Sequence, residues 1–252
     1  MSFHYFFQKY FILFFILNKV KDYKIFFRSL CFIVLLAKSV FFDKIYFNFL
    51  LILVRFYISM NYLITGPMFA GKSKYLIKTL DYLLMEKSDI KILFIYPNIS
   101  YRGYFCRDKN VVFDKRIDII TEEELEDKFT NIENYLSNYD VVGIDEFCFL
   151  NKTSEFIKLI KDFSRNNINI DFYIASLDMD FKRNYWESVS SLIEEDLIDV
   201  HIKVFGKCDC GRKGIYSKRI VKDVDRIVIG DDIYKCVCRY CYEGEDEVKL
   251  NL

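Results

Sequence analysis

Apolar residues along this chain fall into two patterns, short continuous runs and segments in which they recur every three or four positions. The continuous runs predict strands covered on both faces, and the periodic segments predict amphipathic helices. Leu76, Leu80 and Leu84, for example, mark one face of a helix. The predicted strands lie at residues 62–64, 91–96, 141–145, 170–177 and 200–205.

Two further helices are predicted between these strands. Thr121 and Glu124 form a capping-box pattern that opens a helix ending near Asn138, and the apolar residues of 153–166 lie along one side of another. Strands that alternate with helices predict an α/β fold with a mostly parallel sheet. Ligands of such folds bind at the carboxyl ends of the strands.

The first 59 residues differ in composition from the rest. They hold 14 of the 26 phenylalanines, and eight Lys and Arg residues against two Asp, a net charge of +6. The whole chain has 36 basic and 36 acidic residues, so the remainder carries −6. An aromatic, cationic segment suggests a membrane anchor, but charges interrupt each apolar run before the ~20 residues that a spanning helix needs.

Two interpretations of residues 1–59 follow. In one, this hydrophobic, basic extension is upstream sequence translated from an AT-rich gene, and Met60 is the working start. In the other, it is a native segment that associates with a membrane surface. A signal peptide fits poorly, because no small-x-small cleavage site follows the first apolar run. We therefore expect a cytoplasmic protein, with a membrane as partner only if the extension is native.

A phosphate-binding loop follows the apolar run at 62–64. It fits G-x-x-x-x-G-K-[ST] at each fixed position and runs into the leucine-periodic helix. Its glycines let backbone N–H groups point at phosphates, Lys72 brings a cation to the β- and γ-phosphates, and the Ser73 hydroxyl suits hydrated Mg²⁺. Nucleoside triphosphate binding is therefore predicted. The loop residues are Gly66, Pro67, Met68, Phe69, Ala70, Gly71, Lys72 and Ser73.

An acidic pair, Asp145-Glu146, stands at the end of the strand predicted at 141–145. Asp145 is placed to hold Mg²⁺, and Glu146 is a candidate base for an attacking hydroxyl; the alternative is a solvated strand end. Phe181 follows the next strand and is able to stack on a planar base, or else belongs to the core. Arg102 and Arg183 are candidate phosphate contacts or solvated charges.

Cysteines gather in the last fifth of the chain, where short β-like runs predict a small metal-stabilised lobe. Cys238-x-x-Cys241 is a metal-binding pair, and Cys208-x-Cys210, one residue shorter than usual, is its expected partner around structural Zn²⁺. Cys236 is an alternative ligand. Clustered thiols beside a nucleotide loop indicate a reducing cytosol. The cysteines expected to be ordinary thiols are Cys31, Cys106 and Cys148.

From Met60 to about Glu243 these motifs resemble the type II thymidine kinase family, the class of the cytosol and of large DNA viruses. The loop carries Pro-Met-Phe inside the generic pattern, which is more specific than a P-loop alone. The other matches are Asp145-Glu146, Leu177-Asp-x-x-Phe181-x-Arg183, Tyr216-Ser-Lys-Arg219 and Val237-Cys-Arg-x-Cys-Tyr242.

The resemblance implies a P-loop α/β kinase domain over 60–205 and a zinc-binding lasso subdomain over 206–252. It implies ATP-dependent phosphorylation of the thymidine 5′-hydroxyl, with Glu146 as the catalytic base, and a homotetramer. ATP, Mg²⁺ and structural Zn²⁺ are the implied cofactors. Phe181 would pack on thymine, and the 226–230 backbone would hold the base. The implied substrate-binding residues are Met68, Leu177, Phe181, Arg226, Ile227, Val228, Ile229, Gly230 and Tyr234.

Several departures from the family pattern leave alternatives open. Cys148 stands where a glutamine is usual, and Phe147 stands where a small residue is expected. One residue is missing from the first cysteine pair and another near Asp231. A broader deoxynucleoside kinase and a nucleotide-binding protein without kinase activity therefore stay as alternatives. A nucleic-acid partner is not expected, because the part after Met60 is acidic.

Overall fold

The computed structural model describes residues 59–98, 106, 108, 110–166, 168–222, 225–228, 230 and 232–247, and of 245–247 only the backbone. The predictions for residues 1–58, which include Cys31, fall outside this set. So do those for Arg102, Ile229 and Asp231. The domain boundaries proposed from the sequence stay predictions.

Six parallel strands form one sheet in the order β3-β2-β4-β5-β1-β6. β5 lies between β1 and β4, so the three carboxyl ends that carry most predicted site residues are adjacent. The parallel α/β fold expected from the sequence is confirmed. The strands are β1 (Asn61–Thr65), β2 (Ile92–Tyr96), β3 (Ile117–Thr121), β4 (Val141–Ile144), β5 (Asp171–Ser176) and β6 (Val200–Lys203).

Strand β3 was missed by the sequence analysis. It buries Ile117 and Ile120 but exposes Asp118 and Ile119, so it shows neither a continuous apolar run nor strict alternation. It lies at the edge of the sheet, where β2 is its one neighbour. Edge strands tolerate short lengths and charged residues, which explains the weak signal.

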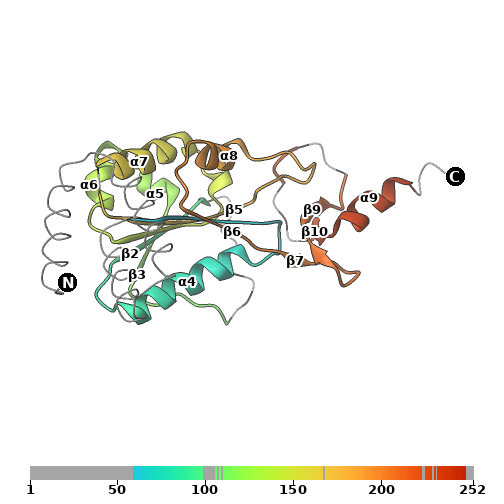
Figure 1. Ribbon diagram of the computed structural model, residues 1–252, viewed down its shortest axis with the longest axis horizontal. Helices are drawn as coiled ribbons and strands as arrows, with labels where there is room; N and C mark the ends of the chain where they lie inside the picture. Colours follow the sequence, from blue (N-terminus) through green and yellow to red (C-terminus); the bar gives the residue numbers. More distant parts are fainter. Residues whose placement is uncertain are drawn as a thin grey trace, which may run out of the picture. The chain divides into compact units, whose positions relative to one another are not determined.

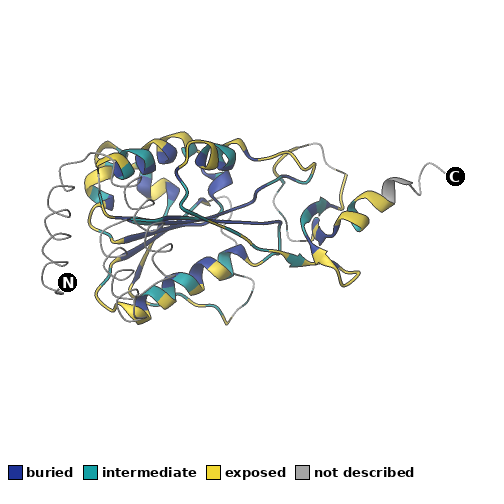
Figure 2. Ribbon diagram, in the orientation of Figure 1, coloured by how far each residue is buried: buried dark blue, intermediate teal, exposed yellow. Residues whose placement is uncertain are grey.

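Helices cover both faces of the sheet and bury an apolar cluster on each (Figure 1; Figure 2). α4 (Lys72–Glu86) buries its periodic leucines on one face, as predicted. α7 (Thr153–Asn166) matches its predicted bounds and packs Phe156 and Phe163 on the other face. α8 (Glu187–Glu194) lies on that face too and was not predicted.

The continuous helix predicted up to Asn138 is wrong. The capping box exists, with Thr121 Oγ1 accepting from the Glu124 N–H at 3.1 Å, but the helix ends after one turn. Phe129 turns toward α7 and packs edge-on against Phe156 with ring centroids 5.8 Å apart, a tertiary contact that overrides helix propensity. The segment forms α5 (Glu122–Glu126), η2 (Phe129–Asn131) and α6 (Ile132–Leu136).

Short antiparallel strands and one helix form the cysteine-rich part. The helix α9 (Arg239–Glu247) was not predicted, because its sequence RYCYEGEDE has no apolar period. None of the described helices has the length and apolar character to cross a membrane. The strands pair as β7 (Gly206–Lys207) with β8 (Lys213–Gly214), and β9 (Tyr216–Arg219) with β10 (Tyr234–Val237).

Candidate active site and metal centre

The loop after β1 has the geometry of a phosphate cradle. Gly71 adopts φ 85°, which glycine reaches without steric penalty, and α4 begins at the next residue. The N-terminus of α4 therefore favours an anion at the loop. Lys72 is buried, and its Nζ donates to the carbonyl oxygen of Pro67 at 3.0 Å. The ammonium group thus lies over the loop, where phosphate oxygens would be its stronger acceptors.

Asp145, at the carboxyl end of β4, lies beside this loop. The Ser73 hydroxyl donates to its carboxylate, and the charge of Lys72 also acts on it. Burial, followed by repulsion from Glu146, raises the pKa of Asp145 to about 7. A buried carboxylate that lacks a full counter-charge, next to a serine hydroxyl, is a donor set that fits hydrated Mg²⁺.

The raised pKa of Asp145 predicts how the ligand-free protein responds to pH. The folded-state pKa exceeds the ~3.9 of an unfolded Asp, so this group's contribution to stability falls as pH rises from about 4 to about 7. Asp145→Asn replaces the ionisable carboxyl by a neutral amide, so the variant does not lose this stability as pH rises. We expect the variant to exceed wild type in free energy of unfolding by on the order of 1–3 kcal/mol at pH 8, and by far less at pH 4, in urea titrations. A difference that does not change with pH contradicts the assignment.

Glu146 has a strained backbone and a carboxylate oxygen that no described residue contacts by a hydrogen bond. Its φ of 48° and ψ of 43° lie in the left-handed region, which costs a non-glycine residue about 1–2 kcal/mol. Its Oε2 is buried and has no hydrogen-bond partner within the described part of the chain. Strain and an orphaned acceptor at one residue fit a base whose partner is a substrate hydroxyl.

Phe147 and Cys148, which depart from the family pattern directly after Glu146, are buried in the core. Phe147 is fully buried. The backbone N–H of Cys148 donates to Ser176 Oγ at 3.1 Å, and burial raises the pKa of its thiol to about 12. Cys148 is therefore a neutral thiol packed behind the acidic pair.

Arg219 is the centre of the region where base-binding residues were predicted. Its guanidinium lies 3.7 Å from the centroid of the Phe181 ring and donates to Tyr234 Oη at 2.6 Å. It also donates to the carbonyl oxygens of Asp225 and Arg226. One buried cation thus joins the predicted stacking aromatic, the loop between β9 and β10, and β10 itself.

The phosphate loop contacts the cysteine-rich part through Met68. Its backbone N–H donates to Ser217 Oγ at 2.9 Å, and its side chain packs against the apolar cluster that contains Leu177. Ile227 is exposed and Val228 half-buried in the loop between β9 and β10. Gly230 of the same loop packs close to the side chain of Ile233.

Two arginines near this loop make different contacts. Arg226 Nε pairs with Asp180 Oδ2 at 3.0 Å, and its guanidinium lies 4.1 Å from the Trp186 ring centroid. Arg183 pairs with Glu243 at 3.2 Å and lies over the Tyr242 ring, so it contacts α9. The phosphate contact of Arg183 stays a prediction.

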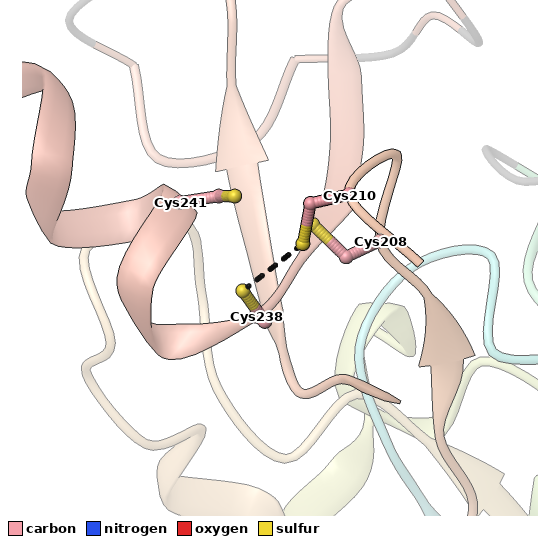
Figure 3. A group of neighbouring side chains, drawn as sticks. All are labelled: Cys208, Cys210, Cys238 and Cys241. Atoms are coloured by element: carbon pink, nitrogen blue, oxygen red, sulfur yellow. Dashed lines mark hydrogen bonds between the residues drawn. The ribbon is translucent and has the colours of Figure 1, made fainter. Parts of the chain in front are cut away.

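Four cysteine sulfurs converge at the start of α9 (Figure 3). All four lie within 4.8 Å of one another. Two of them are 3.6 Å apart, near the ~3.8 Å between ligands of tetrahedral Zn²⁺ with Zn–S bonds of about 2.3 Å. A hydrogen bond from the Cys241 N–H lowers the pKa of the Cys238 thiol to about 6, which favours the thiolate. The set fits zinc and consists of Cys208, Cys210, Cys238 and Cys241.

The shortened first pair closes through a tight turn. Gly211 N donates to the Cys208 carbonyl oxygen at 2.8 Å, and Cys208 N donates to that of Arg212 at 2.9 Å. Gly211 has φ 86°, so glycine permits this turn. One residue between the two cysteines is therefore enough to point both sulfurs at the cluster.

Cys236, the alternative ligand, lies outside the cluster. Its sulfur packs between Gly206 and Gly214, where an added Cβ on either glycine would come within 2.4 Å of it. Burial raises the pKa of its thiol. Cys236 therefore packs the two hairpins together.

Two residues that organise this site had no role predicted from sequence patterns. Ser217 and Arg219 occupy the buried positions of β9, but a search for alternating apolar residues passes over this strand because its inward residues are polar. Arg219 was noticed only as part of a family motif. An arginine in a short strand near tyrosines was the signal that could have indicated this role for Arg219. The same pattern is also typical of a surface strand.

A parallel sheet, a loop that opens α4 with a buried lysine, and an acid at the end of β4 define a P-loop nucleotide-binding protein. The chain belongs to the thymidine kinase family, whose model, described as "Thymidine kinase", matches residues 59–242. This is a family of ATP-using kinases with nucleoside substrates.

Curated relatives agree with this assignment. A thymidine kinase of Mesomycoplasma hyopneumoniae (strain 7448) is 30% identical over 195 residues, 75% of this chain and 97% of that protein. The thymidine kinase of vaccinia virus (strain Ankara) is 30% identical over 72% of this chain and 96% of that protein. The thymidine kinase of raccoon poxvirus is 31% identical over 73% of this chain and 96% of that protein. Domain III of Thermotoga maritima DnaA aligns with 57% of this chain and 54% of its own at TM-score 0.37 and 16% identity, too weak to bear on the assignment.

Proposed function

We propose that the protein phosphorylates thymidine at its 5′-hydroxyl, converting ATP to ADP. Membership of the thymidine kinase family supports thymidine and ATP as the substrates. One observation carries the chemistry: the orphaned Oε2 of Glu146 lies next to Asp145, which is itself hydrogen-bonded to Ser73 of the phosphate loop. Base, metal-binding acid and phosphate cradle thus share the carboxyl edge of the sheet.

In this proposal Glu146 takes the proton of the thymidine 5′-hydroxyl while the hydroxyl oxygen attacks the γ-phosphorus of ATP. The bond between the γ-phosphorus and the β–γ bridging oxygen breaks, and ADP leaves. Lys72 neutralises charge on the β- and γ-phosphates, and loop N–H groups orient them. Mg²⁺, which Ser73 and Asp145 would hold, supplies further charge neutralisation when bound. Positioning and electrostatics therefore provide most of the rate enhancement.

The base-binding roles follow the same arrangement. Phe181 packs on thymine, Met68 and Leu177 line the pocket, and the 226–230 backbone with Tyr234 holds the base. Support comes from the contacts of Arg219 with Phe181, Tyr234 and the loop backbone. Because the Arg219 guanidinium contacts the ring, the tyrosine and the loop, it would hold them in fixed positions around a planar base.

Arg219→Gln tests this base-binding arrangement. We expect the KM for thymidine to rise roughly tenfold or more, because a multiply bonded buried cation is lost, while the KM for ATP changes less than about twofold. Steady-state kinetics in both substrates measure the effect, and zinc content per chain checks that the metal centre persists. Arg239→Gln, an exposed arginine of the same lobe, is the control. Equal changes in both KM values would show a general loss of structure instead.

Zinc, assembly and location complete the proposal. We propose that the four-cysteine cluster holds structural Zn²⁺, which its sulfur spacing supports. Reduced thiol ligands favour the cytoplasm. The homotetramer rests on the family resemblance.

Full-length protein with labelled thymidine, ATP and Mg²⁺ tests the function. We expect labelled dTMP with its phosphate on the 5′-oxygen, one ADP for each dTMP, and much slower turnover of deoxycytidine. Binding of ATP without phosphorylation of any nucleoside contradicts the proposal. Equal turnover of deoxycytidine would instead contradict the choice of thymidine.

A further inference from the structure

Trp186, the one tryptophan of the sequence, has a buried indole N–H that finds no acceptor among the described residues. The residue is 8% exposed, and no residue of the described segments accepts a hydrogen bond from its Nε1. Buried donors in folded proteins nearly always have partners. An orphaned donor close to a binding site therefore points to an acceptor on the ligand.

The backbone fixes Trp186 at the sheet edge that the proposed reaction uses. Its N–H donates to the carbonyl oxygen of Asp178 at 3.2 Å, and Met179 pairs with Tyr185 in an antiparallel bridge. The chain thus leaves the end of β5 and returns to Asp178 at Trp186, which directly precedes α8. Since β5 lies between β1 and β4, the segment that holds Trp186 follows the strand next to those that carry the phosphate loop and the acidic pair.

The side chains around the indole belong to the segments proposed to hold substrate. Phe149, shortly after the proposed catalytic base, meets the ring edge to face with centroids 5.4 Å apart. Arg226 of the proposed base-binding loop lies 4.1 Å from the ring centroid. Leu177 belongs to the same apolar cluster, and Met68 packs against it. The indole therefore contacts Phe149 and Arg226 and shares an apolar cluster with Leu177, a proposed base-pocket residue.

We propose that the Trp186 indole N–H donates a hydrogen bond to a carbonyl oxygen of thymine. This inference rests on the proposed function and adds a specificity-determining residue to it. Indole nitrogen is a donor only, and thymine presents acceptors at O2 and O4. Cytosine has an amino group in place of O4, so a contact at that position would place two donors against each other and discriminate against deoxycytidine.

Trp186→Phe keeps an aromatic ring and removes the N–H. We expect the Kd and KM for thymidine to rise roughly tenfold, the loss expected for one hydrogen bond to a buried donor, and the KM for ATP to change less than about twofold. Because the smaller phenyl ring leaves a gap in the core, the ligand-free variant loses some stability, and the KM for ATP shows whether the site keeps its structure. Tyr185→Phe, which removes an exposed hydroxyl one position away, is the control and should change none of these values.

A packing role for Trp186 would give a different pattern. It predicts similar rises in the KM for thymidine and the KM for ATP, which contradicts the inference. Thymidine affinity equal to wild type contradicts it as well. If wild type phosphorylates thymidine and Trp186→Phe matches it, the inference fails while the proposed function stands. A wild-type protein that neither binds nor phosphorylates thymidine overturns both.

Thio-substituted nucleosides identify the acceptor. Sulfur accepts hydrogen bonds more weakly than oxygen, so 2-thiothymidine and 4-thiothymidine each weaken one candidate contact. Trp186→Phe should cost roughly tenfold in Kd with thymidine but less than about twofold with the analogue whose sulfur replaces the contacted oxygen. The full loss with both analogues contradicts a hydrogen bond to either carbonyl.

Discussion

Glu146→Gln is expected to lower kcat for thymidine phosphorylation by roughly 10²–10⁴, the usual contribution of a general base. Glutamine preserves the size of the side chain and one acceptor oxygen, but it cannot take the proton of the 5′-hydroxyl. Wild-type Glu146 holds a buried oxygen without a partner in the described part of the protein, so the group is available for that proton. The KM for ATP should change less than about twofold, because Lys72 and the loop remain intact.

Rapid-quench measurement of the chemical step separates this effect from slow product release. Glu155→Gln removes a solvent-exposed carboxylate on α7 and should leave kcat unchanged. A Glu146→Gln protein with wild-type turnover would exclude Glu146 as the base. A large loss of ATP affinity in the same variant would indicate that the substitution had disturbed the loop instead.

Cys238→Ala is expected to reduce bound zinc from one ion per chain to below about 0.1, since structural zinc sites need all four ligands and contribute about 10–16 kcal/mol of apparent binding free energy. The lobe around the cluster has a small core, with Val237 and two of the cysteines buried and Tyr216 and Tyr242 partly so. Without the metal, β9 should lose its fixed position. Arg219 and Ser217 lie on β9, so thymidine turnover should fall with the zinc.

Metal analysis of the purified full-length protein measures this effect, and limited proteolysis shows whether the lobe opens. Cys236→Ala is the matched control, because Cys236 is buried in the same lobe but packs between two glycines. It should keep one zinc per chain. Retained zinc in Cys238→Ala, or lost zinc in Cys236→Ala, contradicts the ligand set.

The sequence predicted the parts of the fold that local chemistry encodes. The phosphate loop, the leucine face of α4 and the four cysteines depend on spacing within a few residues, and each lies where expected. Local patterns misled where distant contacts decide. The packing of Phe129 on Phe156 interrupts the helix predicted to reach Asn138, and the edge position of β3 lets it form without an apolar run.

The half of the site proposed for catalysis was predictable, and the half proposed for base binding was largely hidden. Asp145 and the loop were placed correctly relative to each other because strand order follows from parallel α/β topology. The bond from Met68 to Ser217 joins residues separated by 149 positions, and no sequence pattern encodes it. Arg219 and Trp186 matter through neighbours that only the folded chain supplies.

A crystal structure of the full-length protein with thymidine, Mg²⁺ and a non-hydrolysable ATP analogue tests the central claim most directly. The account predicts a Glu146 carboxylate oxygen about 2.6–3.2 Å from the thymidine 5′-oxygen, and that oxygen about 3–3.5 Å from the γ-phosphorus. Lys72 Nζ should leave the Pro67 carbonyl for the phosphates. A 5′-hydroxyl bound away from Glu146, with the γ-phosphate facing another surface, would contradict the account.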